Sequence, residues 1–348
     1  MKKLLKLAVS ALAVISMFVQ PLKASSVELI GAGATFPYPL YSKMFDVYNK
    51  EHGIKINYSA IGSGGGIRQL MAKTVDFGGT DAFLTDKEIR EMPGSVVHIP
   101  TCIGAVVFAF NVPGVPELNL TPDVIAGIFL GKIKKWSAPE IRKINQNVKM
   151  PDINIVVIHR SDGSGTTFIF SDYVSKISNE WKNSVGTGTS LKWPCGLGAK
   201  GNPGVAGLIK QIPGSIGYVE LIYALSNKIP FACVQNKSGI FIKPSLLNTS
   251  IAANVELPDD MRVSITNTNE KNGYPICGFT WIIVYKEQNY DNRSFEKAKE
   301  LVNLLWWITH QGQRYTEALH YASLPKEAVV KAERIIQSIT YNGKPIIK

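Results

Sequence analysis

The residues best suited to chemistry lie in the segment HRSDGSGTTF, which runs from His159 to Phe168. Arg160 offers a planar guanidinium fork that suits a tetrahedral oxyanion, and the hydroxyls of Ser164 and Thr166 add hydrogen-bond donors. The segment follows the apolar run INIVVI and precedes a run typical of a helix. A helix that begins there directs free N–H groups and the positive end of its dipole at one point. This arrangement is typical of an anion-binding loop.

Two earlier segments repeat this pattern of strand, glycine-rich turn and helix start. GAGATF ends just before Pro37 and carries Thr35, and IGSGGG ends just before Ile67 and carries Ser63. Glycine lets the backbone approach a ligand closely. In open α/β sheets, ligands bind beyond the carboxyl ends of the strands. One such loop would be an ordinary turn, but three loops with matched hydroxyls predict a shared oxyanion site.

Asp81, in GGTDA after a short strand, is the residue that would discriminate between oxyanions. Phosphate near neutral pH carries a proton that a carboxylate can accept, whereas sulfate has none to donate. A site built to pair with a donor rejects a ligand that lacks it. Asp81 therefore favours phosphate over the alternatives, sulfate and molybdate, although an Asp in a turn can also be a capping residue. Asp162 is close enough to Arg160 to orient it or partly neutralise it.

Catalytic signatures do not appear around these loops. DGSGTT lacks the Lys of the nucleotide-binding motif G-x-x-x-x-G-K-[ST]. Neither Ser164 nor Ser63 fits the hydrolase motif G-x-S-x-G, and the histidines show no triad spacing. Clusters of Asp and His suited to metal catalysis are not evident either. We therefore expect a binding protein with no catalytic residues, no metal and no cofactor.

The first residues have the order of a secretory signal peptide: MKKLLK, an apolar stretch, then PLKA. We expect a signal peptide at residues 1–24, cleaved after Ala24, and export to the periplasm; an uncleaved anchor is the alternative. No Cys lies directly after the apolar stretch, which argues against a lipid anchor. Of the net charge of +11, four units belong to lysines of this leader, which leaves a diffuse +7. The densest basic group, GKIKKW, is typical of a solvated surface, and no basic stripe indicates nucleic-acid binding.

Alternating strand and helix patterns predict an α/β fold with a mostly parallel sheet. A helix is expected from Thr121, with Pro122 in its first position, and a long strand over 102–112. Residues 226–272 show no clear periodicity of apolar residues and are expected to be irregular. Cys102 and Cys277 lie in apolar surroundings typical of buried thiols. Together with Cys195 and Cys233 they leave three disulfide pairings, or none, open.

Taken together, several motifs resemble the family of periplasmic phosphate-binding proteins (PstS) that serve bacterial Pst ABC importers. The motifs are GAGATFPYPLY, IGSGGGIRQL, VDFGGTDA and RSDGSGTTF, with weaker likenesses such as GLGAKGN, GSIGYVE and YASLP. The resemblance implies a type II periplasmic binding fold of two α/β lobes, with a ligand cleft and a hinge of crossover strands. The family's phosphate contacts fall on Ala34, Thr35, Phe36, Ser63, Asp81, Arg160, Ser164, Gly165 and Thr166. His159 and Gly64 depart from common family residues without affecting these positions.

The resemblance also implies the lobe boundaries and the partners. Lobe one comprises residues 25–102 and 280–348, and lobe two comprises residues 103–279, with the hinge near 100–106 and 277–283. Inorganic phosphate is the implied ligand. An inner-membrane ABC permease with its cytoplasmic ATPase is the implied partner, and the protein is expected to be a monomer. A surface or adhesive protein that keeps the fold is the rival interpretation.

Overall fold

The structure is a computed structural model that describes residues 27–347. The predicted signal peptide and its cleavage position lie outside the described residues. Among the helices that are described, none is both long enough and apolar enough to cross a membrane.

An eight-stranded sheet runs through both parts of the molecule. Its strands are β1 (Glu28–Gly33), β2 (Lys55–Ala60), β3 (Phe77–Thr80), β4 (Val96–Asn111), β6 (Val156–Arg160), β7 (Leu197–Ala199), β8 (Ser215–Glu220) and β11 (Cys277–Tyr285). They lie in the order β2-β1-β3-β11-β4-β8-β6-β7. Smaller sheets are made by β5 (Asn119–Leu120), β9 (Cys233–Gln235) and β10 (Phe241–Ile242), and by β12 (Thr340–Tyr341) and β13 (Lys344–Pro345).

The prediction of a mostly parallel sheet is right at each end of the sheet and wrong in its middle. β1 is parallel to β2 and β3, and β6 is parallel to β7 and β8. The long strand β4 is antiparallel both to β11 and, over Val106–Asn111, to β8. β11 is also antiparallel to β3. β4 therefore runs in the same sense as the strands of the first end and in the opposite sense to those of the second end. Local sequence patterns do not reveal this long-range arrangement.

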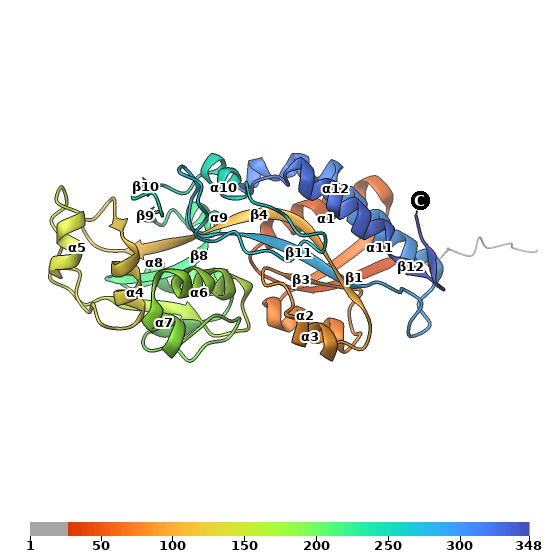
Figure 1. Cartoon of the computed structure of the whole chain (residues 1–348), viewed down its shortest axis with the longest axis horizontal. Coiled ribbons are helices and arrows are strands. Elements are labelled where there is room, and N and C mark those ends of the chain that lie inside the picture. Colours follow the sequence, from red (N-terminus) through yellow and green to blue (C-terminus); the bar gives the residue numbers. More distant parts are fainter. Residues whose placement is uncertain (1–26, 348) are drawn as a thin grey trace, which may run out of the picture.

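Helices cover both ends of the sheet (Figure 1). The helices of the first part of the chain are α1 (Tyr38–His52), α2 (Ser63–Met71), α3 (Asp86–Glu91), α4 (Pro122–Phe129), α5 (Pro139–Ile144), α6 (Gly165–Ile177) and α7 (Asn179–Ser184). The later ones are α8 (Gly201–Gln211), α9 (Leu221–Ser226), α10 (Leu246–Ala252), α11 (Phe295–Thr309) and α12 (Lys326–Gln337), with short 3-10 turns at Gln311–Tyr315 and Glu317–Leu319.

Two halves can be distinguished along the long axis in Figure 1. We call β1–β3 with α1–α3, α11 and α12 the first half, and β6–β8 with α4–α9 the second half. β4 and β11 run between them. β11 is buried along its whole length, and β4 is buried at nearly every residue. The connection between the halves is therefore a pair of paired, apolar strands rather than a loose linker.

Most predicted elements are confirmed, including the cap of α4. Thr121 accepts a hydrogen bond from the backbone N–H of Val124, and Pro122 occupies the first turn. Residues 226–272 are largely irregular, as expected, but contain α10 and the short strands β9 and β10. α2 begins at Ser63 and not at Ile67. Gly66 has to be glycine in this helix because a Cβ there would lie only 2.4 Å from the carbonyl oxygen of Ala32 in β1.

All four cysteines are free. Cys102 and Cys277 are fully buried in the apolar core, as their surroundings predict. Cys195 and Cys233 are partly buried. No disulfide therefore contributes to the fold described here.

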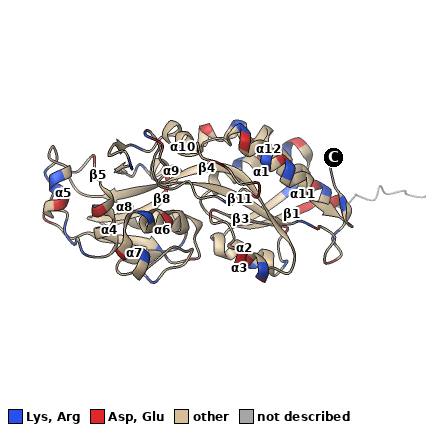
Figure 2. Ribbon diagram, viewed as in Figure 1, with Lys and Arg blue, Asp and Glu red and all other residues tan. Residues whose placement is uncertain are grey.

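Lys and Arg residues are interspersed with Asp and Glu residues along the helices, for example in α12 (Figure 2). In the basic group GKIKKW, Lys132 pairs with Glu180, and Lys135 pairs with Asp152 at 3.1 Å. These pairs are exposed and contribute little to stability. They confirm that this group is a solvated surface.

Candidate functional site

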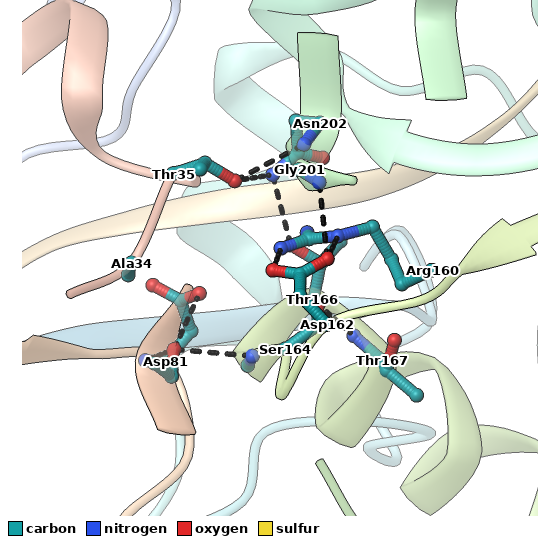
Figure 3. Close-up of polar contacts among 12 residues, drawn as sticks. Ala34, Thr35, Asp81, Arg160, Asp162, Ser164, Thr166, Thr167, Gly201 and Asn202 are labelled. Carbon is teal, nitrogen blue, oxygen red and sulfur yellow. Dashed lines mark hydrogen bonds and ion pairs between the residues drawn. The ribbon is translucent and has the colours of Figure 1, made fainter. Parts of the chain in front are cut away.

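The three predicted loops lie together between the two halves of the molecule (Figure 3). Thr35 follows β1, Ser63 is the first residue of α2, and Ser164 caps α6 by accepting the N–H of Thr167 at 3.0 Å. Each loop joins a strand to the first turn of a helix, where the backbone N–H groups have no partner within the helix itself. The predicted site residues are almost entirely buried: Ala34, Thr35, Phe36, Ser63, Asp81, Arg160, Ser164, Gly165 and Thr166.

Direct hydrogen bonds join the loops of the first half to those of the second half. The hydroxyl oxygen of Ser63 accepts the backbone N–H of Gly165 at 3.1 Å. The hydroxyl oxygen of Thr35 accepts the side-chain amide of Asn202 at 2.9 Å, and the phenol of Tyr223 donates to the carbonyl oxygen of Thr35. The structure is therefore one in which the two halves are closed on each other.

Gly165 is required at this junction for steric reasons. A Cβ on Gly165 would lie 2.5 Å from the Asp81 carboxylate and 2.5 Å from the Ser63 hydroxyl. Any side chain there would push the first turn of α6 away from the first half. Glycine thus allows the N-terminus of α6 to reach the opposite loops.

Arg160, at the end of β6, is held in a fixed orientation. Its Nε and Nη2 donate to the two carboxylate oxygens of Asp162 at 2.7 and 2.5 Å, and its Nη1 donates to the hydroxyl of Thr166 at 3.2 Å. Burial raises the pKa of Asp162, but the hydrogen bonds and charge of Arg160 outweigh it and hold that pKa below its usual value. Asp162 also accepts the N–H of Gly201. The neighbouring His159 lies away from these groups, stacked on Trp193.

Asp81, immediately after β3, is the carboxyl group that faces the loops. Its Oδ1 accepts the hydroxyl of Thr280 at 2.8 Å, and its Oδ2 lies 3.5 Å from the hydroxyl of Ser63. Burial raises the pKa of Asp81 to about 7, despite the opposing effects of Thr280, Arg160 and Ser63. Near neutral pH this carboxyl can therefore accept a hydrogen bond when ionised or donate one when protonated.

Three polar residues at this junction were not among the predicted site residues. Thr280 comes from β11, Tyr223 from α9, and Asn202 from the first turn of α8. For Asn202 the sequence does carry a signal, because GAKGN repeats the pattern of strand, glycine and helix start. The positions of Thr280 and Tyr223 depend on long-range packing, and no local pattern points to them.

The chemistry available here is recognition of an oxyanion. The donors are backbone N–H groups, hydroxyls and a guanidinium, and Asp81 adds one carboxyl group. Within residues 27–347, no group of three or more His, Cys, Asp or Glu side chains is placed to hold a metal ion.

Comparisons with known proteins agree with this geometry. A family model described as the PBP superfamily domain matches residues 20–308 of the chain. It is 41% identical over 310 residues to the phosphate-binding protein PstS of Pasteurella multocida, which covers 88% of each chain. Over 316 residues it is 42% identical to PstS of Xylella fastidiosa, with 89% of this chain and 85% of the relative covered. The chain belongs to the PstS family.

Solved structures show the same fold at low sequence identity. A periplasmic phosphate-binding protein solved with phosphate, PfluDING, superposes with a TM-score of 0.68 at 20% identity, covering 88% of this chain and 93% of that one. A phosphate ABC transporter substrate-binding protein from Clostridium perfringens gives a TM-score of 0.63 at 17% identity, covering 86% and 100%. The fold is the periplasmic binding protein fold with α/β lobes, as predicted. The PstS relatives are named as binding proteins and not as enzymes.

Proposed function

We propose that this protein binds inorganic phosphate and delivers it to an inner-membrane ABC permease for import. The observation that carries the proposal is the junction of three helix N-termini and Arg160 with a single facing carboxyl group, Asp81. Membership of the PstS family and phosphate-bound structural neighbours support it. The protein is then a binding protein and not an enzyme.

The proposed phosphate ligands are the residues that surround this junction: Ala34, Thr35, Phe36, Ser63, Asp81, Arg160, Ser164, Gly165 and Thr166. Arg160, the hydroxyls and the N–H groups donate to phosphate oxygens. Asp81 accepts the remaining P–OH, and Asp162 orients Arg160. No metal or cofactor takes part in this scheme.

For the domain organisation we propose lobe one at 25–102 and 280–348, and lobe two at 103–279. β4 and β11 cross between the lobes near 100–106 and 277–283, so bending there would open the site. Thr35, Phe36, Ser63 and Asp81 then belong to lobe one, and Arg160, Ser164, Gly165 and Thr166 to lobe two. Phosphate stabilises the closed state because only that state brings both sets to the anion.

For the cellular setting we propose export through a signal peptide at residues 1–24 and a monomeric protein in the periplasm. The partner is an ABC permease that works with a cytoplasmic ATPase. A deletion strain grown under phosphate starvation tests this transport role. A defect in phosphate uptake is expected, whereas normal uptake would favour a surface or adhesive role.

Calorimetric titration of the mature chain, stripped of bound phosphate, tests the ligand. At about pH 8.5, above the pKa of Asp81, tight binding of phosphate and no detectable binding of sulfate are expected, because the ionised Asp81 carboxylate has no donor partner in a bound sulfate. Comparable affinities for the two anions would contradict the proposed role of Asp81. Absence of phosphate binding would contradict the proposed function itself.

A further inference from the structure

The side chain of Asn202 connects hydroxyl groups that belong to opposite halves of the molecule. It is fully buried. Its Nδ2 donates to the hydroxyl oxygen of Thr35 at 2.9 Å and to that of Thr166 at 3.0 Å (Figure 3). One amide proton of Asn202 is therefore donated to Thr35 of the first half and the other to Thr166 of the second half.

The orientation of this amide follows from its third contact. The Oδ1 of Asn202 accepts the backbone N–H of Glu220 at 2.9 Å. A backbone N–H can only donate, so the carbonyl oxygen must face Glu220 and the NH₂ group must face the two threonines. The reverse orientation would set two donors against each other in a buried site.

Both threonine hydroxyls consequently have no accepting capacity left. The Thr35 oxygen accepts the backbone N–H of Asn202 at 3.1 Å as well as its Nδ2. The Thr166 oxygen accepts Nη1 of Arg160 at 3.2 Å as well as Nδ2 of Asn202. A hydroxyl oxygen has two lone pairs, and here both are occupied. The only further hydrogen bond that either hydroxyl can make is to donate its own proton.

The hydroxyl oxygen of Ser63 likewise accepts two N–H groups, but its own proton is directed to Oδ2 of Asp81 at 3.5 Å. These N–H groups belong to Gly165 at 3.1 Å and to Asp81 at 3.3 Å. Three hydroxyls at the junction are thus obligatory donors, and Asn202 determines two of them.

We propose that Asn202 is a positioning residue that fixes the hydroxyls of Thr35 and Thr166 as donors to phosphate. The role of accepting a P–OH group is thereby left to Asp81. This inference rests on the proposed function. It explains how a site rich in hydroxyls, which ordinarily accept as readily as they donate, distinguishes anions by their protons.

Asn202→Asp is the decisive variant because it keeps the shape of the side chain and its bond to the Glu220 N–H. Its second oxygen accepts where the amide donated, so the threonine protons turn toward it and away from phosphate. We expect phosphate affinity to fall by about 100-fold or more. In Asn202→Leu nothing fixes the two threonine hydroxyls as donors, but nothing turns them into acceptors either. Its phosphate affinity should fall by about tenfold. If Asn202 only held the loops in place, the isosteric Asp variant would stay close to wild type, and that result would overturn the proposal.

The new negative charge is separated from the hydroxyl effect by repeating the substitution in a background that lacks both hydroxyls, Thr35→Val with Thr166→Val. The proposal predicts a much smaller additional loss from Asn202→Asp in that background. An equal loss would show that charge repulsion alone is responsible, and would overturn the proposal.

Two further readouts complete the test. The loss caused by Asn202→Asp should shrink as the pH is lowered from about 8 to about 5.5, because protonation of the new carboxyl restores a donor; a loss that does not depend on pH contradicts the proposal. Thermal melting of the ligand-free variants reports folding. If the Asp variant does not fold, wild-type phosphate affinity in Asn202→Leu is sufficient to overturn the proposal. If wild-type protein binds no phosphate, the proposed function fails and this inference fails with it.

Discussion

Gly64 and Gly163 face each other across the two halves, and the N–H of Gly64 donates to the carbonyl oxygen of Gly163 at 2.9 Å. Gly64 lies in the first turn of α2, and Gly163 lies just before α6. A Cβ on Gly163 would lie 3.1 Å from the Cα of Gly64, and one on Gly64 would lie 3.2 Å from the Cα of Gly163. The absence of side chains on both residues lets the halves approach this closely.

Gly163→Val should therefore weaken phosphate binding, by about tenfold or more, because the branched side chain holds the halves apart. Titration calorimetry measures the effect. Gly207→Ala in α8 is the matched control, since a Cβ there would meet nothing within 4 Å. The control should bind as wild type does. Wild-type affinity in the Val variant as well would show that closure does not depend on this contact.

Asp81→Asn should weaken phosphate binding and reduce the discrimination against sulfate. The amide replaces an acceptor with a group that can donate to any oxyanion oxygen. Competition titrations of phosphate with sulfate measure both effects, and a loss of phosphate affinity of about tenfold or more is expected. Asp162→Asn, which also removes a carboxylate near the junction, is the control and should keep the discrimination. Unchanged affinity and unchanged selection in Asp81→Asn would make Asp81 a structural residue.

The ligand-free protein should lose stability between acidic and mildly basic pH through Asp81. Burial raises the pKa of this carboxyl from 3.8 to about 7. The raised pKa means that the folded state binds the proton more tightly than the unfolded state does. Its contribution is fully present below pH 3.8 and is lost as the pH rises through about 7. Thermal melting of wild type and Asp81→Asn is measured in phosphate-free buffer. The stability of wild type should fall more steeply from about pH 5 to about pH 8 than that of the variant. Parallel plots of stability against pH would rule out this linkage.

His98 should have the opposite effect at acidic pH. Its Nε2 accepts the N–H of Leu84 at 3.1 Å, which requires the neutral ring. Burial, with help from the charge of Arg262, lowers its pKa from 6.5 to about 3. The stability that the neutral ring provides is present above pH 6.5 and is lost as the pH falls toward about 3. Denaturant unfolding of wild type and His98→Gln over this range should show a larger acid loss in wild type, on the order of a few kcal/mol at most. An identical loss of stability at acidic pH in both proteins would mean that a group other than His98 causes it.

Local sequence patterns were sufficient to locate the loops that make up the candidate site. The order of strand, glycine and helix start is encoded within about ten residues, so Thr35, Ser63 and Arg160 could be found without a structure. The same patterns placed the start of α2 too late, at Ile67. Glycine has a low intrinsic helix propensity. Only the structure shows why glycines stand in this first turn: a Cβ would come close to Gly163 at Gly64, to Ile61 at Gly65 and to Ala32 of β1 at Gly66.

What the sequence determined by itself was the set of donors, the two carboxyl groups Asp81 and Asp162, and the α/β class, because each depends on neighbours along the chain. Tertiary structure alone decided which of these groups meet and in which protonation state. Thr280 bonds to Asp81 across 199 residues, and Asn202 bonds to Thr35 across 167 residues. Burial between the two halves raises the pKa of Asp81 to about 7. Hydrogen-bond direction and desolvation depend on packing between distant segments, and no local pattern specifies them.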